Sequence, residues 1–217
     1  MKTNGKFLMA GCFALLAVLL IVLIRFVNVA AIGPEGTSIG LSGANQAVHQ
    51  LTGVNMIWYD ITDWLGFAAL FTAFIFAMVG FVQLIKRRSL LKVDSDILAL
   101  GGLYVVMIVL YLFFEKVIVN YRPIIMPGCE HPEASFPSSH TMLVCVIMGS
   151  AIMLLPSYIS DRTLCRVLRA VCWAVIAVTV VGRLVSGVHW LTDILGGLLI
   201  SAALLSLFAA VRAKLKA

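Results

Sequence analysis

Composition and charge exclude the soluble classes of protein for this chain of 217 residues. Hydrophobic residues make up 62% of the sequence and charged residues only 12%, which is far outside the range of soluble domains. The formal net charge of +6 does not indicate a nucleic-acid partner, because there is no soluble basic domain to dock on a duplex. The apolar residues form long continuous runs, which predict one all-α domain over residues 1–217, a bundle of about six transmembrane helices and not a β-barrel.

The first predicted span covers residues 7–24 and follows two lysines, Lys2 and Lys6. The same pattern begins a secretory signal peptide. However, the apolar run is long for such a peptide, and Arg25 follows it where a small-residue cleavage site would be expected. We therefore predict a span that is not cleaved off.

Residues 33–63 are more polar than the apolar runs before and after them. We predict an external loop here, with a short amphipathic helix at the membrane surface and with Trp58 and Tyr59 as aromatic anchors. His49 in this loop is expected to be solvated.

Five further apolar runs predict the remaining spans, at residues 64–85, 97–114, 140–156, 167–185 and 191–211. Six spans place both termini on the same side of the membrane. Paired glycines in two of the spans are expected to allow close helix packing, namely Gly101, Gly102, Gly196 and Gly197.

Basic residues identify the side on which the termini lie. Under this arrangement 12 of the 16 Lys and Arg residues fall there: Lys2, Lys6, Lys86, Arg87, Arg88, Lys92, Arg162, Arg166, Arg169, Arg212, Lys214 and Lys216. The positive-inside rule makes this side the cytoplasm. Of the other four, Lys116, Arg122 and Arg183 lie in or beside the external loops. Cations that oppose the orientation bias are candidates for binding an anion.

A polar stretch, residues 182–193, reads GRLVSGVHWLTD between two apolar runs. Asp193 follows His189 by one helical turn, so its carboxylate can fix the tautomer of the imidazole and stabilise an imidazolium. On one continuous helix Arg183 and His189 would lie about 120° apart. A helix that ends near Gly187, followed by another from about His189, would let them converge. The alternative is a His-Asp pair that only ties two helices together.

The segment 115–140 joins the third and fourth spans on the external side and reads EKVIVNYRPIIMPGCEHPEASFPSSH. Its four prolines exclude a continuous helix. Ser138, Ser139 and His140 directly precede an apolar helix, so their hydroxyls and free backbone N–H groups form a candidate anion site. The alternative is an ordinary N-cap by Ser138 or Ser139. The predicted topology favours an anion site, because it places six candidates on one membrane face: Arg122, Ser138, His140, Arg183, His189 and Asp193.

Three motifs together resemble the signature of the type 2 phosphatidic acid phosphatase (PAP2) superfamily, whose pattern is KxxxxxxRP, PSGH and SRxxxxxHxxxD. The matching stretches here are residues 116–123, 137–140 and 182–193. Lys116 lies one residue closer to Arg122 than in the family pattern, and Glu115 occupies the lysine position. Ser139 replaces the family glycine, and Gly182 replaces the family serine.

The resemblance implies a lipid phosphatase that works through a phosphohistidine. His189 would attack phosphorus, with Asp193 orienting its ring, while His140 would protonate the leaving oxygen and later activate water. The phosphate-binding residues implied are Arg122, Arg183, Ser138, Ser139 and Lys116. No cofactor or metal is expected, because arginines supply the countercharge and the sequence lacks the carboxylate cluster of a magnesium site.

Two other interpretations share part of this pattern. A phosphotransferase would pass the same phosphoryl group to a second lipid. A transporter or structural membrane protein would carry the motifs in vestigial form, although the complete Arg-His-Asp set argues against it.

For the phosphatase, the expected partners are the lipid bilayer and a lipid phosphate in the outer leaflet. A site on the external face favours undecaprenyl pyrophosphate over phosphatidic acid and phosphatidylglycerol phosphate as the substrate. Short loops favour a multi-pass enzyme of the bacterial inner membrane, with both termini in the cytoplasm.

Overall fold

The computed structural model describes residues 3–216. Six long helices form a bundle: α1 (Thr3–Phe26), α3 (Met56–Arg87), α4 (Ser95–Lys116), α5 (Ser139–Tyr158), α6 (Arg162–Val185) and α7 (Leu191–Leu215). A short helix, α2 (Ser42–Thr52), and two 3₁₀ turns, η1 (Pro34–Gly36) and η2 (Leu90–Lys92), lie in the connections. Within the described residues, these six helices are long and apolar enough to cross a membrane. The predicted six-span bundle is therefore confirmed.

The second span differs most from its predicted boundaries. Its helix, α3, begins at Met56, eight residues earlier than predicted. Asn55 caps it, because the Asn55 side-chain oxygen accepts hydrogen bonds from two N–H groups of the first turn at 3.1 and 3.3 Å. Trp58 and Tyr59 belong to the start of this helix, so the prediction that they lie in a loop is wrong. Asp63 lies one turn after Tyr59 and shares its face of the helix.

The predicted short helix of the first loop is α2, and it is tied to the start of α7. The Asn45 side chain accepts a hydrogen bond from the Thr192 backbone N–H and donates one to the Thr192 hydroxyl, both at 3.1 Å. His49 is half-buried and not solvated as predicted, since its ring lies 5.3 Å from the Trp190 ring. Burial lowers the pKa of His49.

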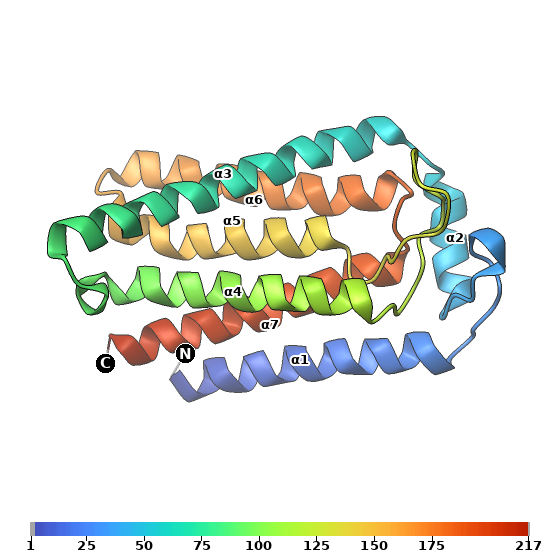
Figure 1. Ribbon diagram of the computed structural model, residues 1–217, viewed down its shortest axis with the longest axis horizontal. Helices are drawn as coiled ribbons and strands as arrows, with labels where there is room; N and C mark the ends of the chain where they lie inside the picture. The colour runs from blue at the N-terminus through green and yellow to red at the C-terminus, as the bar shows by residue number, and fades with distance from the viewer. Residues whose placement is uncertain (1–2, 217) are drawn as a thin grey trace.

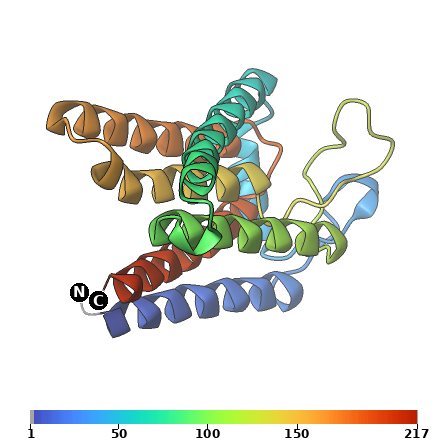
Figure 2. The same ribbon diagram turned by 60° about the vertical axis from the view of Figure 1, so that its left-hand side comes forward.

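The helices are arranged around α5, which packs against α3, α6 and α7, while α1 runs along α7 (Figure 1). Residues 27–55 and 117–138 gather at one end of the bundle, the loop end, opposite the first turn of α1 and the last turn of α7 (Figures 1 and 2). Of the basic residues predicted to be cytoplasmic, Lys2 lies outside the described residues. The other 11 lie in connections and helix ends away from the loop end.

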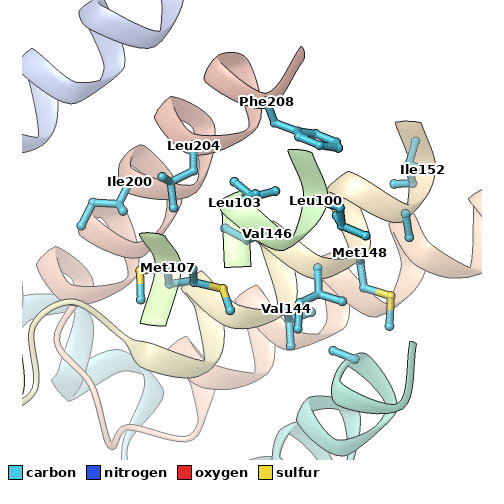
Figure 3. Packing of buried hydrophobic residues seen from close by; sticks show 14 of the residues in the cluster. Leu100, Leu103, Met107, Val144, Val146, Met148, Ile152, Ile200, Leu204 and Phe208 are labelled. Atoms are coloured by element: carbon cyan, nitrogen blue, oxygen red, sulfur yellow. The ribbon is translucent and has the colours of Figure 1, made fainter. Parts of the chain in front are cut away.

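The core is an apolar layer between α4, α5 and α7 (Figure 3). Its labelled members are Leu100, Leu103, Met107, Val144, Val146, Met148, Ile152, Ile200, Leu204 and Phe208. Because α5 is buried along most of its length, its first turn has a fixed position at the loop end.

Two glycines at the start of α7 allow the chain to approach closely there. A Cβ on Gly196 would lie 2.2 Å from the ring of Phe136, and a Cβ on Gly197 would lie 3.1 Å from the Ser138 carbonyl oxygen. The prediction of close packing is confirmed at these two positions. It is wrong for Gly101 and Gly102, where a Cβ would have no neighbour within 4 Å.

Candidate active site

The chain breaks between α6 and α7, as predicted near Gly187. Gly187 has φ of +68°, and a Cβ there would lie 1.9 Å from the Gly53 carbonyl oxygen, so only glycine fits. This break directs Arg183, in the last turn of α6, and His189, just before α7, toward the start of α5. His189 lines the same small cavity as Ser139.

His189 and Asp193 are joined through a third side chain that the sequence analysis did not find. His189 Nδ1 lies 3.8 Å from Asp193 Oδ2, too far for a hydrogen bond. The Ser135 hydroxyl bridges them, since it lies 3.0 Å from Nδ1 and donates to Asp193 Oδ2 at 2.5 Å. The expected direct contact is therefore replaced by a bridge. No local pattern could have revealed Ser135, because 54 residues separate it from His189.

Asp193 is held rigidly at the first turn of α7. Its Oδ2 accepts a hydrogen bond from the Trp190 N–H at 2.8 Å, and its Oδ1 accepts one from the Asn120 amide at 3.4 Å. The carboxylate is fully buried. These donors compensate for its burial and fix its position.

Burial also affects the protonation of His189, whose side chain is only 2% exposed. It lowers the pKa of His189, and the nearby Arg122 and Arg183 cations act in the same direction, whereas the negative charge of the Asp193 carboxylate opposes them. A lowered pKa keeps the imidazole neutral at pH 7. Its Nε2 is buried and has no hydrogen-bond partner among the described residues.

Ser138 is the N-cap of α5, which confirms that alternative for this residue. Its Oγ accepts hydrogen bonds from the Thr141 N–H at 3.5 Å and from the Thr141 hydroxyl at 3.0 Å. Its backbone N–H donates to the Asp193 carbonyl oxygen at 3.0 Å, so the starts of α5 and α7 are linked. The N–H groups of Ser139 and His140 belong to the first turn and have no acceptor within the helix.

Asp63 contacts both Arg183 and His140, two of the predicted site residues. One oxygen, Oδ1, accepts a hydrogen bond from Arg183 Nη2 at 2.7 Å and lies 2.9 Å from His140 Nε2. Arg183 is 1% exposed and lies over the Tyr59 ring, 4.6 Å from its centroid. Asp63 was not predicted as a site residue, because residues 33–63 were expected to form a loop. The one available signal was an aspartate one turn from a tyrosine beside an apolar run.

Arg122 brings a guanidinium with free hydrogen-bond donors to the same region. Its Nε and Nη1 are buried and have no hydrogen-bond partner among the described residues, while Nε forms an ion pair with Glu133 Oε2 at 3.5 Å. The backbone N–H of Arg122 donates to the Glu133 carbonyl oxygen at 3.0 Å, which fixes the segment. Buried donors without acceptors point to a bound anion.

Two cavities at this site share three lining residues. The smaller, of about 20 Å³, is polar and is lined by Glu115, Arg122, Ser135, Ser139 and His189 among others. The larger, of about 340 Å³, opens between α3, α4 and α5 and has His140 and Asp63 at its polar end. Both are lined by Tyr111, Ser139 and Met142. Lys116 is exposed and lines neither cavity, so the structure does not bring it to the site.

Comparison with known proteins gives a similar fold and a matching family. The fold is similar to a solved structure described as the first transmembrane PAP2 type phosphatidylglycerolphosphate phosphatase from Bacillus subtilis, with a TM-score of 0.64 and 18% identity over 96% of each chain. No curated protein matches the sequence. The model of the PAP2 superfamily matches residues 105–217, which is more than half of the chain and includes every motif of the site. The chain therefore belongs to the PAP2 superfamily.

Proposed function

We propose that this protein is a membrane lipid phosphatase that works through a phosphohistidine on His189. The observation that carries the proposal is the Nε2 atom of His189, which is buried, lacks a partner among the described residues and belongs to a ring in the same small cavity as Arg122. A neutral imidazole nitrogen beside a cation that attracts phosphate is suited to attack phosphorus.

The reaction then takes two steps. In the first, Nε2 of His189 bonds to phosphorus, the phosphorus–oxygen bond to the lipid breaks, and His140 gives a proton to the leaving oxygen. In the second, His140 takes a proton from water, the water oxygen bonds to phosphorus, and the phosphorus–nitrogen bond breaks to release phosphate. The partial exposure of the His140 side chain, 32%, suits exchange of a proton with water.

The phosphate oxygens would be bound by Arg122, Arg183 and the free N–H groups of Ser139 and His140. The Ser138 hydroxyl remains a candidate, because its own proton is not used when its oxygen caps α5. Lys116 falls outside this set, since it is exposed away from both cavities.

Arginines supply the countercharge in this mechanism, so we propose that no metal ion takes part. Among residues 3–216, no three His, Cys, Asp or Glu side chains are grouped so that they could hold a metal ion. Activity should persist in EDTA, and vanadate should inhibit as a five-coordinate mimic of phosphorus. Loss of activity in EDTA that magnesium restores would contradict this part of the proposal.

The larger cavity supports a lipid as substrate. Its walls are mainly apolar and include Phe67, Leu70, Met107, Ile108 and Leu143. An acyl or prenyl chain could stay in this cavity or in the bilayer while its phosphate reaches His189. That arrangement avoids extracting the chain into water, at a cost of about 0.8 kcal/mol per CH₂.

Two lipids are the main candidates. We favour undecaprenyl pyrophosphate, because the basic helix ends lie opposite the loop end and orient the site toward the outer leaflet of a bacterial inner membrane. Phosphatidylglycerol phosphate is the second candidate, because the similar structure from Bacillus subtilis is described as a phosphatidylglycerolphosphate phosphatase. Comparison of kcat/KM for both lipids in mixed micelles separates them, and a tenfold preference for phosphatidylglycerol phosphate would overturn our choice.

The orientation can be tested with the native Cys129, which is exposed in the loop between α4 and α5. A membrane-impermeant maleimide should label it in intact inner-membrane spheroplasts, and Cys129→Ser should remove the signal. Labelling only after permeabilisation would place the loop end in the cytoplasm.

The decisive experiment is phosphate release by the purified protein. His189→Ala should lower kcat by several orders of magnitude and leave a folded protein, and full activity in this variant would end the mechanism. Added acceptor lipid distinguishes the phosphotransferase, which would yield a phosphorylated acceptor in place of free phosphate. A protein that releases no phosphate from any lipid phosphate would favour the transporter or structural alternative.

A further inference from the structure

Ser135 has a place in the site that no motif assigns to it. It lies in the loop between α4 and α5 and is 2% exposed. Its backbone N–H donates to the Asn120 carbonyl oxygen at 2.9 Å, which fixes the residue. Its hydroxyl is 3.0 Å from His189 Nδ1 and donates to Asp193 Oδ2 at 2.5 Å.

His189 and Asp193 have no direct hydrogen bond, because Asp193 Oδ2 and His189 Nδ1 are 3.8 Å apart. The carboxylate is held in its position by the Trp190 N–H at 2.8 Å and the Asn120 amide at 3.4 Å. The serine oxygen bridges the two atoms from the side, within hydrogen-bond distance of both.

The direction of the hydrogen bonds follows from the number of protons. A carboxylate only accepts, and a serine hydroxyl has one proton. Because that proton points to Asp193, the serine oxygen can only accept from His189. Nδ1 must therefore carry the ring proton, which leaves the lone pair of the neutral ring on Nε2, the buried atom without a hydrogen-bond partner on a ring that lines the small cavity.

We propose that Ser135 is a positioning residue that relays Asp193 to His189 and thereby fixes the Nδ1–H tautomer of the imidazole. The inference rests on the proposed function in one respect, since only a nucleophilic Nε2 makes this tautomer the reactive one. The Ser135 hydroxyl accepts the hydrogen bond from Nδ1–H that the Asp193 carboxylate would accept in a direct contact.

Removal of the hydroxyl should leave the ring free to adopt either tautomer. We expect Ser135→Ala to lower kcat by about 10²-fold, since a wrong tautomer disables the attacking nitrogen, and to change KM by less than about threefold. Ser135→Thr keeps the hydroxyl and should recover most of the loss. Ser201→Ala is the matched control, because Ser201 is also 2% exposed and its hydroxyl donates to Gly197 O, remote from His189.

The tautomer itself is the test that does not depend on turnover. The chain has four histidines, so ¹⁵N-histidine labelling gives a simple spectrum, and His189→Gln assigns the signal of interest. At pH 7.5 in detergent micelles, we expect the Nδ1–H pattern for His189 in the wild type and in the Ser201→Ala control. Ser135→Ala should show a mixture or the Nε2–H pattern.

The outcomes separate the two proposals. An Nε2–H pattern in the wild type overturns the inference even if Ser135→Ala does not fold. An unchanged tautomer and unchanged kcat in Ser135→Ala also overturn it. If the tautomer depends on Ser135 but the protein releases no phosphate, the positioning role stands and the proposed function fails.

Discussion

Asp63→Asn tests the least expected contact of the site. A single oxygen of Asp63 lies 2.7 Å from the Arg183 guanidinium and 2.9 Å from His140. At 2.7 Å a unit ion pair has a Coulomb energy between about 1.5 kcal/mol in water and about 6 kcal/mol near a protein surface. Asp63 is 36% exposed and Arg183 keeps its contact with the Tyr59 ring, so we expect a net destabilisation of about 2 kcal/mol.

A bound phosphate should restore the stability that Asp63→Asn loses. The phosphate group needs the same Arg183 nitrogen that Asp63 holds, so the carboxylate and the substrate compete. Without the negative charge, vanadate or inorganic phosphate should bind about tenfold more tightly, which corresponds to about 1.4 kcal/mol. The turnover number should fall, because His140 loses its carboxylate partner.

The assay is thermal unfolding of the purified protein in detergent, with and without vanadate. Asp63→Asn should unfold roughly 4–8 °C lower than the wild type, and vanadate should raise its midpoint more than it raises that of the wild type. Asp60→Asn is the matched control, since Asp60 is exposed on the same helix. Equal gains from vanadate in Asp63→Asn and the wild type would refute the competition.

Three further predictions concern other parts of the site. Arg122→Ala should lower kcat/KM by about 10²-fold or more, whereas Lys116→Ala should change it by less than about threefold; equal losses would restore the lysine as a ligand. Because burial lowers the pKa of His189 from its usual value near 6.5, the nucleophile should be protonated only below that pH. The acid limb of the kcat/KM profile should therefore lie below pH 6.5, and a limb above it would contradict the assignment. Gly196→Ala places a Cβ 2.2 Å from Phe136, and we expect about 2 kcal/mol of destabilisation in chemical unfolding, together with a lower kcat; unchanged stability would show that the ring moves freely.

The membrane spans and the break between α6 and α7 near Gly187 were predictable, because each is indicated by neighbouring residues in the sequence. An apolar run of about 20 residues predicts a transmembrane helix wherever it occurs. Gly187 between Arg183 and His189 indicated a turn, and the structure gives this glycine a φ that other residues rarely adopt. Each inference needed only neighbouring residues, and each was confirmed.

The side chains that complete the site were not predictable, for two physical reasons. Asp63 lies at the polar end of a membrane helix, where charged residues blur the boundary between span and loop. Ser135 acts through contacts with residues 54 and 58 positions away, and their geometry depends on how a loop rich in proline folds back on α7. Lys116 is the opposite case. Its place in the first motif predicted a phosphate ligand, but it lies in the last turn of α4 and lines neither cavity.

The two histidines line different cavities that share Ser139, and this arrangement fits the chemistry proposed for them. Displacement at phosphorus needs the attacking and leaving atoms roughly in line. His189 lines the small polar cavity, whereas His140 lines the large apolar one, and Ser139 lines both. A phosphate centred near Ser139 would therefore meet the nucleophile on one side and hold its lipid oxygen on the other, beside the residue that protonates it. In the proposed mechanism the apolar cavity would lie on the leaving side, so the substrate's tail and the proton donor would be on the same side of the reacting phosphorus.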